Sequence, residues 1–297
     1  MPEWYGTADL ARDLGLTPAA VRRLLRRHGL TAGRGRRYRW PEADYRNLLR
    51  QVRGDTTIDD SEVRAFSELA DRWWDENGPL AMLHRLNPVR LSYIRRQFIR
   101  HFDLDGDHPR PLEGLAILDA GCGGGLVTEP LARLGATMTG LDASGEAIAV
   151  ARQHAGRSGL RIDWRQGTLE DLALARPGYD ALVALEIIEH VSSLETFVAA
   201  AVRCVKPGGL IIFSTLNRTL RSLLLAKITA EYIARLVPRG THDVSRFVRP
   251  VELVRQCRRS GARLTDVTGL AFHVIDNRWR LSPDSAVNYM AAAVTGR

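Results

Sequence analysis

Residues 116–125, AILDAGCGGG, carry the clearest indication of the fold class of this chain. The apolar run Ala116–Ala120 predicts a buried strand, and glycines follow it directly, starting at Gly121. Glycine allows the backbone to turn sharply and to approach a ligand closely. Asp142 follows Gly121 by 21 residues, at the end of the next apolar run. This order of strand, glycine-rich turn, helix, strand and acidic residue predicts a nucleoside-binding site.

The same alternation of apolar runs and helical periodicity continues along the chain. We predict further strands over Thr137–Leu141, Ala181–Leu185 and Leu210–Ser214, the last after the turn Pro207-Gly208-Gly209, and helices over Val127–Leu134, Glu146–Ala155 and Leu194–Val205. This pattern is typical of an α/β fold with a mostly parallel sheet. Such sheets bind ligands at the carboxyl ends of their strands. The glycine-rich turn, Asp142 and the segment that starts at Glu186 all follow the ends of predicted strands.

The glycine-rich turn separates two classes of cofactor. Dinucleotide enzymes carry GxGxxG, which frees a helix N-terminus for a pyrophosphate. Here residues 121–126 read GCGGGL, with glycine in the fourth place and leucine in the sixth, so the fingerprint fails. The segment LDAGCGGG resembles instead the first motif of class I S-adenosylmethionine-dependent methyltransferases, whose cofactor has no phosphate. We expect Asp142 to accept hydrogen bonds from the ribose hydroxyls of that cofactor.

A short acidic motif, Glu186-Ile187-Ile188-Glu189-His190, follows the strand predicted at 181–185. On a helical turn, Glu186, Glu189 and His190 would share one face. Two carboxylates and an imidazole suit a divalent cation, which would help a bound phenol to lose its proton. His190 alone could instead act as general base. A solvated helix end with acidic residues in its first turn is the third interpretation.

Composition and charge limit the classes of protein that the chain can belong to. Three cysteines without short spacing argue against a disulfide framework or a thiolate zinc site and suit a reducing cytoplasm. The first residues lack a secretory signal, and no apolar run is long enough to span a membrane. Residues 1–53 hold twelve arginines and no lysine against five acidic residues, so they carry seven of the eight net positive charges.

The basic segment is predicted to be a separate module, residues 1–53, joined by the polar linker 54–61 to a large domain, residues 62–297. We predict a helix over Thr7–Leu14, a turn at Gly15, a second helix from Thr17-Pro18 to about His28, and a basic-aromatic wing over Arg34–Trp40 followed by a helix over Pro41–Arg50. Apolar or small packing residues are expected at Leu10, Ala11, Leu14, Leu16, Val21 and Leu24, with Arg22, Arg23, Arg26 and Arg27 pointing outward. The module resembles the winged helix-turn-helix of the MerR and excisionase type. That resemblance implies DNA binding, whereas docking on protein or on anionic lipid is the competing interpretation.

The large domain resembles the ubiquinone-biosynthesis O-methyltransferase family from Phe66 to Tyr289. Besides the glycine-rich turn, the matching segments are WWDENGPLAMLHRLNPVRLSYI, LEIIEHV, VKPGGLIIFSTLNRT, AEYIARLVPRGTHDV and WRLSPDSAVNYM, in the order expected of the family. The resemblance implies a class I methyltransferase fold. It also implies methyl transfer from S-adenosylmethionine to a phenolic hydroxyl of 2-polyprenyl-6-hydroxyphenol or 3-demethylubiquinol.

The resemblance also implies roles for individual residues. Arg90, Gly121, Asp142 and Leu185 fall on the cofactor-contacting positions of the family. The planar guanidinium of Arg90 suits the methionine carboxylate, and Leu185, which replaces an expected methionine, would contribute apolar packing. Glu186, Glu189 and His190 fall on the divalent-cation positions, which implies magnesium.

The segment Leu220–Pro238 carries an apolar residue every fourth position, flanked by basic residues. Such a stripe is typical of a core face, but a basic amphipathic helix can also lie in an anionic lipid interface. In the family this segment is associated with membrane contact. We therefore expect a cytoplasmic protein that associates peripherally with the membrane, and other ubiquinone-synthesis enzymes are candidate partners.

Two rival functions remain open at this point. The methyltransferase could act on another small catechol or phenol. Alternatively, the large domain could sense S-adenosylmethionine for a DNA-binding regulator, although an intact motif at Glu186, Glu189 and His190 disfavours a pure sensor.

Overall fold

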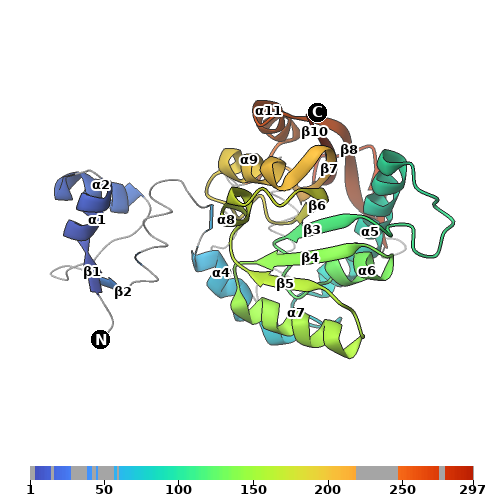
Figure 1. The fold of residues 1–297 in the computed structure, drawn as a ribbon, viewed down its shortest axis with the longest axis horizontal. Helices are drawn as coiled ribbons and strands as arrows, with labels where there is room; N and C mark the ends of the chain where they lie inside the picture. The colour runs from blue at the N-terminus through green and yellow to red at the C-terminus, as the bar shows by residue number, and fades with distance from the viewer. Residues whose placement is uncertain are drawn as a thin grey trace. The chain divides into compact units, whose positions relative to one another are not determined.

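The computed structural model describes residues 4–14, 17–27, 39–41, 45, 57–58, 60–218, 247–273 and 278–296. The chain divides into two compact units, residues 1–57 and 58–297, drawn in Figure 1. This division falls inside the range 54–61. The module, linker and domain boundaries chosen from the sequence stay predictions.

The N-terminal unit is built on two helices and a two-stranded antiparallel ribbon. Its elements are β1 (Trp4–Gly6), α1 (Thr7–Leu14), α2 (Pro18–Arg27) and β2 (Arg39–Pro41). Asp9 Oδ2 accepts a hydrogen bond from the Gly6 amide at 2.8 Å, which satisfies a free donor at the start of α1. A small core of Leu10, Ala11, Val21, Leu25 and Tyr45 holds the two helices together.

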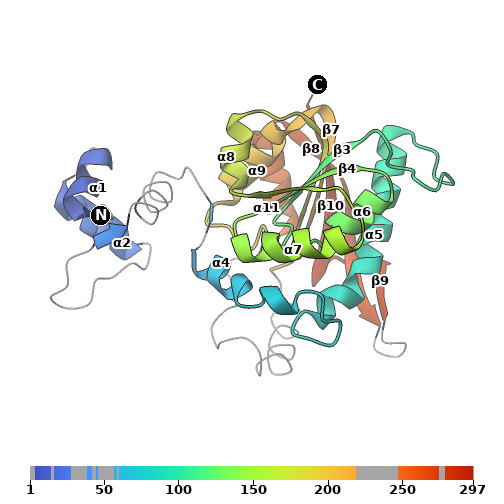
Figure 2. The ribbon, with the colours of Figure 1, turned by 60° about the horizontal axis from the view of Figure 1, so that its bottom comes forward.

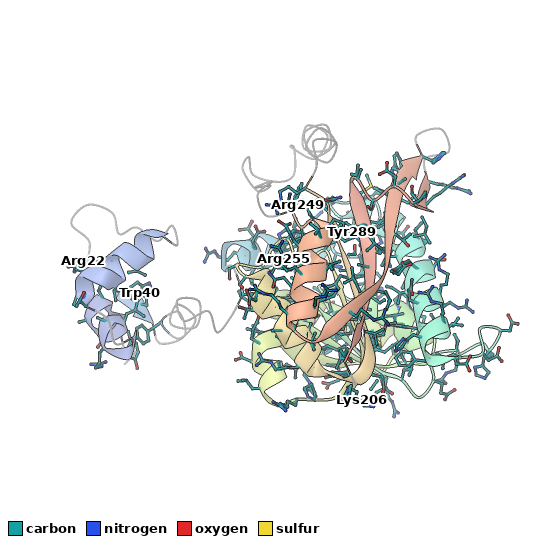
Figure 3. The ribbon with its side chains drawn as sticks, turned by 90° about the horizontal axis from the view of Figure 1, so that it is seen from above. Arg22, Trp40, Lys206, Arg249, Arg255 and Tyr289 are labelled. Carbon is teal, nitrogen blue, oxygen red and sulfur yellow. The ribbon has the colours of Figure 1, made fainter. Side chains whose placement is uncertain are left out.

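Both helices of this unit begin where the sequence predicts them. Leu10, Ala11 and Val21 are buried as expected, and Arg22 is exposed (Figure 3). Leu25 is also buried in this core, although the sequence pattern did not predict it as a packing residue. The turn at Gly15 and most of the predicted wing and third helix lie outside the described residues, and the described end of the wing, Arg39–Pro41, is strand β2. The helix-turn-helix assignment therefore stays a prediction.

The large unit contains an eight-stranded sheet with the order β5-β4-β3-β6-β7-β10-β8-β9. The strands are β3 (Ala116–Ala120), β4 (Thr137–Asp142), β5 (Asp163–Gln166), β6 (Tyr179–Leu185), β7 (Val205–Leu216), β8 (Ala262–His273), β9 (Arg278–Ser282) and β10 (Asn288–Thr295). The five strands from β3 to β7 pair in parallel, and β10 inserts antiparallel between β7 and β8. The carboxyl ends of the parallel strands therefore meet at one edge, which is where such sheets bind ligands.

Helices cover both faces of this sheet, as Figures 1 and 2 show. They are α4 (Asp60–Ser67), the 3-10 turn η1 (Ala70–Arg72), α5 (Ala81–Phe102), α6 (Thr128–Arg133), α7 (Gly145–Arg157), α8 (Leu169–Leu174), α9 (Leu194–Cys204) and α11 (Pro250–Arg259). Among the described residues, no helix is long and apolar enough to cross a membrane.

The two faces of the sheet form two hydrophobic clusters. In β6, Leu182 and Ala184 pack with α8, α9 and α11, whereas Ala181 and Val183 pack with α5 and α6. Successive strand residues point to opposite faces, so a strand that is apolar throughout can fill both clusters. Tyr289 of β10, labelled in Figure 3, extends the first cluster and donates its hydroxyl to the Val248 carbonyl at 3.0 Å.

The predicted strands and helices of the large domain are confirmed, with ends that differ by a few residues. One difference concerns Pro207-Gly208-Gly209, which we expected as a turn before a strand. These residues lie within β7, where the pairing jumps from Tyr179–Val205 to Ala181–Leu210. The extra residues of β7 are absorbed as an irregularity, with Gly208 at φ +77°.

Candidate active site

The glycine-rich loop turns at the carboxyl end of β3, in the centre of the parallel sheet. Gly121 has φ +75°, a left-handed conformation that favours glycine, and a Cβ there would lie 3.0 Å from the Ile187 side chain. The amides of Gly121 and Cys122 both donate to the carbonyl of Leu141, at 2.8 and 3.1 Å. These bonds tie the loop to the end of β4, next to Asp142.

Asp142 holds the other side of this loop. Its Oδ2 accepts a hydrogen bond from the Gly123 amide at 2.8 Å, and its Oδ1 accepts one from the Ser144 amide at 2.8 Å. Burial raises the pKa of Asp142, and these backbone hydrogen bonds partly oppose the increase. The structure thus places Gly121 and Asp142 together at one edge of the sheet, as predicted.

Arg90 approaches the same edge from α5. Its side chain is 5% exposed, and its Nη2 lies 2.7 Å from Glu186 Oε1, an ion pair. The pair does not have hydrogen-bond geometry at Nη2, and Arg90 Nε has no acceptor among the described residues. Ser214, at the end of β7, donates its hydroxyl to the same Glu186 oxygen. Arg90 therefore presents a buried cation with remaining hydrogen-bonding capacity.

The motif at 186–190 does not form the helical turn that we expected from its spacing. Glu186 has φ +50°, and the chain continues as a tight turn in which the His190 amide donates to the Ile187 carbonyl at 2.9 Å. Leu185, half-buried at the end of β6, pairs with Ser214 in the sheet. The strand ends abruptly here, so tertiary contacts rather than helical periodicity set the direction of each side chain.

Glu189 is buried, and Thr215 donates its hydroxyl to Glu189 Oε2 at 2.7 Å. Burial, followed by the neighbouring Glu186 carboxylate, raises the pKa of Glu189 to about 7. Both effects favour the protonated, neutral form of the carboxyl group, which reduces the cost of burying it next to a like charge.

His190 contacts helix α4. Its Nδ1 lies 3.2 Å from Glu62 Oε2, and the Phe66 ring stands edge-on to the imidazole with centroids 5.4 Å apart. Burial lowers the pKa of His190, but the hydrogen bond to Glu62 and the carboxylates of Glu189, Glu62 and Glu186 outweigh it, so the pKa is raised overall. The remaining ring nitrogen, Nε2, is the one that can take up a proton from a substrate.

The three predicted metal-binding side chains point to three different partners. Glu186 pairs with Arg90, Glu189 with Thr215, and His190 with Glu62. Their donor types suit a divalent cation. In the part of the chain that the structure describes, however, no group of three or more histidine, cysteine or acidic side chains is arranged to hold a metal ion. In this arrangement each of the three side chains is engaged by a different partner.

Several residues that bear on the site carried no role in the sequence reasoning. Glu62, Ser214 and Thr215 make the hydrogen bonds described above, and Ser214 and Thr215 belong to the quoted segment STLNRT. Trp73 and Trp74, from the segment WWD, lie against the glycine-rich loop. The motifs were visible in the sequence, but the partners of their side chains depend on contacts between distant segments.

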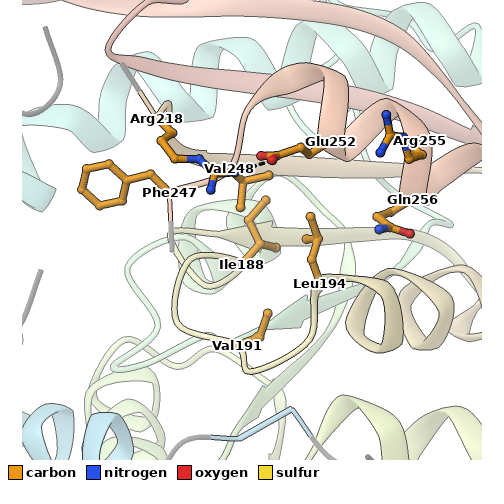
Figure 4. A pocket seen from close by; sticks show the side chains of 9 residues that line it. All are labelled: Ile188, Val191, Leu194, Arg218, Phe247, Val248, Glu252, Arg255 and Gln256. Carbon is orange, nitrogen blue, oxygen red and sulfur yellow. Dashed lines mark hydrogen bonds and ion pairs between the residues drawn. The ribbon is translucent and has the colours of Figure 1, made fainter. Parts of the chain in front are cut away.

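A cavity of about 300 Å³ lies beside the 186–190 segment and is lined in part by Ile188 (Figure 4). Its walls are mixed, because Arg218, Glu252, Arg255 and Gln256 line the cavity alongside five apolar residues. Ile188 and Val191 immediately flank Glu189 and His190. Leu194, Phe247 and Val248 complete the apolar part. The ion pair between Arg218 and Glu252 lies at the cavity as well (Figure 4). The volume is at the lower end of those of small-molecule sites.

Comparisons with known proteins agree with this fold. A family model described as a methyltransferase domain matches residues 118–213, which span β3 to β7. A solved S-adenosylmethionine-dependent methyltransferase from Thermotoga maritima, described as a possible histamine N-methyltransferase, aligns with a TM-score of 0.56 at 16% identity. The alignment covers 78% of this chain and 99% of that one. The chain therefore has the class I S-adenosylmethionine-dependent methyltransferase fold.

Curated relatives narrow the class. A ubiquinone biosynthesis O-methyltransferase from Methylobacterium nodulans is 48% identical over 237 residues, which covers 80% of this chain and 95% of the relative. The protein of the same name from Methylocella silvestris is 46% identical over 249 residues, covering 82% and 97%. The chain belongs to the ubiquinone biosynthesis O-methyltransferase family, as the sequence motifs indicated.

Proposed function

We propose that the carboxyl edge of the sheet binds S-adenosylmethionine through Arg90, Gly121, Asp142 and Leu185. The observation that carries this proposal is the convergence of a glycine-rich loop, the Asp142 carboxylate and a buried guanidinium at one edge. Asp142 is positioned to accept hydrogen bonds from ribose hydroxyls, and Arg90 to pair with the methionine carboxylate. Leu185 would pack against the cofactor.

Calorimetric titration of the full chain with S-adenosylhomocysteine tests this assignment. We expect Asp142→Ala and Arg90→Ala each to weaken binding at least tenfold, since each removes charge-assisted hydrogen bonds worth about 1.5–3 kcal/mol. Arg110→Ala serves as control, because Arg110 is exposed and pairs only loosely with Glu113, at 3.8 Å. Unchanged affinity in both site variants would refute the assignment.

The proposed reaction transfers the methyl group to a phenolic hydroxyl of 2-polyprenyl-6-hydroxyphenol or 3-demethylubiquinol. Bound S-adenosylmethionine supplies an electrophilic methyl group. His190 accepts the phenol proton at Nε2, while Glu62 holds the Nδ1 proton and stabilises the imidazolium. The phenolate oxygen then forms a bond to the methyl carbon as the carbon–sulfur bond breaks in line, leaving S-adenosylhomocysteine.

Transfer of labelled methyl to a short-chain demethylubiquinol tests the substrate. We expect kcat/KM for this substrate to exceed that for a catechol without a prenyl chain. Equal values would favour the rival interpretation, a methyltransferase for some other small phenol. Family membership already favours an enzyme over a pure S-adenosylmethionine sensor.

The cavity beside Ile188 is a candidate site for the first isoprene units of the substrate. The apolar part of its lining suits a hydrocarbon, and the cavity begins at the segment that carries His190. Leu194→Trp would fill this space. We expect the variant to raise the KM for the prenylated substrate and to leave the KM for a catechol without a chain unchanged. A similar effect on both substrates would argue against the assignment.

A divalent cation such as Mg²⁺ at Glu186, Glu189 and His190 is a separate proposal. It is supported by the donor types and by the pKa of Glu189, which is raised first by burial and then by the nearby Glu186 carboxylate. Added Mg²⁺ should raise the Tm of the full chain at pH 8, and Glu189→Gln should abolish that increase. Activity that is insensitive to chelator, with no Mg²⁺-dependent change in Tm, would favour His190 acting alone.

The N-terminal unit is proposed to bind DNA. The concentration of arginine in residues 1–53 and the exposed position of Arg22 on α2 support it. Gel-shift titration of the full chain on mixed-sequence DNA duplex should show binding that weakens as the salt concentration is raised. At a given salt concentration, Arg22→Glu should bind the duplex more weakly than wild type. No shift at low salt would eliminate this proposal.

Peripheral membrane association through Leu220–Pro238 is proposed from the sequence stripe alone, because the segment lies outside the described residues. The charge reversals Arg221→Glu and Arg235→Glu should reduce binding to anionic liposomes and activity on liposome-embedded substrate. Undiminished activity would count against it.

A further inference from the structure

Trp73 covers the glycine-rich loop. It follows the turn Ala70–Arg72, and its side chain is buried, with the whole residue 8% exposed. A Cβ added to Gly123 would lie 2.0 Å from the indole ring, and one added to Gly124 would lie 2.3 Å from it. The ring thus lies across both glycines, so the absence of side chains in the loop is needed for this contact.

The indole N–H of Trp73 is buried and has no acceptor within hydrogen-bonding distance among the described residues. Its neighbour Trp74 differs in this respect, because Trp74 Nε1 donates to the Gly124 carbonyl at 3.0 Å and its ring stacks on His154. Burying an unpaired donor is unfavourable, and such groups are rare in folded proteins. Trp73 therefore presents an unsatisfied donor against the loop where the nucleoside is proposed to bind.

A row of aromatic rings continues from Trp73 to the proposed general base. The Phe66 ring lies 6.4 Å from that of Trp73 and 5.4 Å from that of His190, between centroids. Trp73 is therefore linked to His190 through a single ring, that of Phe66. A ligand at the loop that Trp73 covers could accept a hydrogen bond from the indole N–H, and S-adenosylmethionine offers acceptors in its carboxylate, ribose and adenine.

We propose that Trp73 is a cofactor-binding residue whose indole N–H donates a hydrogen bond to S-adenosylmethionine. The inference rests on the proposed cofactor site at Gly121 and Asp142, and it adds a contact from outside the sheet. The ring keeps water away from the loop, and the N–H gains in the complex the partner that it lacks in the protein alone. Trp74 has a structural role, because its own N–H is already paired.

The variant Trp73→Phe tests this proposal, because it keeps most of the ring and removes the N–H. Calorimetric titration of the full chain with S-adenosylhomocysteine should show binding about 3- to 10-fold weaker than wild type, the value expected for one hydrogen bond. Trp279→Phe is the matched control. Trp279 Nε1 is also buried without a partner among the described residues, but it lies in β9, against Phe272. The affinity of the Trp279→Phe variant for S-adenosylhomocysteine should stay within about twofold of wild type.

The Tm of the ligand-free variants separates cofactor binding from a structural role. Both Trp73→Phe and Trp74→Phe lose packing of ring atoms, but only Trp74→Phe loses a hydrogen bond of the protein alone. Trp73→Phe should therefore lower the Tm less than Trp74→Phe does. Equal affinity of Trp73→Phe and wild type would overturn the proposal, as would an equal weakening in Trp279→Phe. A wild-type chain that does not bind S-adenosylhomocysteine would contradict the cofactor site itself, and this inference with it.

Discussion

At the scale of single residues, the site combines buried ionisable groups whose charges are balanced by specific partners. Arg90, Glu186 and Ser214 form one set, and His190 with Glu62 forms another. Each set joins segments that are far apart in the chain. The raised pKa of His190 consequently depends on contacts between elements, and the pH dependence of activity reports on those contacts.

The pH dependence of the rate should reveal His190. If His190 is the general base, kcat/KM rises with pH as the imidazole loses its proton, and its raised pKa places this rise above the ordinary value of about 6.5. Glu62→Gln removes a carboxylate that raises the pKa, so the rise should move to lower pH. His190→Ala should lower kcat about 10²- to 10⁴-fold. A profile that Glu62→Gln leaves unmoved would exclude the Glu62–His190 pair from the mechanism.

Asp119 supplies a stability prediction. It is buried in β3, where Thr128 donates its hydroxyl to Asp119 Oδ2 at 2.6 Å, and burial raises its pKa to about 7. An acid with a raised pKa in the folded state contributes stability below its unfolded pKa, and this contribution is lost as pH rises through about 7. Asp119→Asn should therefore gain Tm relative to wild type between pH 5 and pH 8. A constant difference across that range would contradict the assigned cause.

At the scale of elements, the loop between β3 and α6 is constrained from both sides. Asp142 binds the Gly123 amide, and Trp73 covers the Cα of the same residue. The segment before α5 therefore determines the position of the loop as much as the sheet does. This explains why a short stretch of helix and turn far upstream belongs to the candidate site.

Gly123→Ala should show how tightly the loop is held. The residue has φ +51°, and its new Cβ would clash with Trp73. We expect a loss of about 1–3 kcal/mol in unfolding free energy, measured with urea, together with weaker S-adenosylhomocysteine binding. Gly156→Ala in α7 is the control. Its Cβ meets nothing within 4 Å, so the variant should gain about 0.4–1 kcal/mol. Wild-type stability in Gly123→Ala would mean that Trp73 moves aside easily.

At the scale of the whole molecule, two compact units have separate cores. The small unit packs around Leu10, Val21 and Leu25, and the large unit contains the sheet and every residue of the candidate site. The curated relatives match about 80% of the chain at 46–48% identity. Methyl transfer should therefore reside in the large unit.

Removal of residues 1–57 tests this division. The remaining chain should fold and transfer methyl groups with a kcat/KM within about twofold of the full chain, because no residue of the candidate site is lost. Circular dichroism would establish that the truncated chain is folded. A folded but inactive fragment would show that the N-terminal unit contributes to catalysis.

In the large domain, local patterns in the sequence were enough to identify strands β3, β4, β6 and β7, the glycine-rich loop and Asp142. These features were predictable because apolar periodicity and glycine geometry act over a few neighbouring residues. The three C-terminal strands that complete the sheet were not predicted, since their pairing links residues that are distant in sequence. Only the tertiary structure decided that Glu186, Glu189 and His190 turn to three different partners, and that Trp73 covers the loop. Those outcomes depend on packing and charge pairing between distant elements. The spacing of residues along the chain carries no information about such contacts.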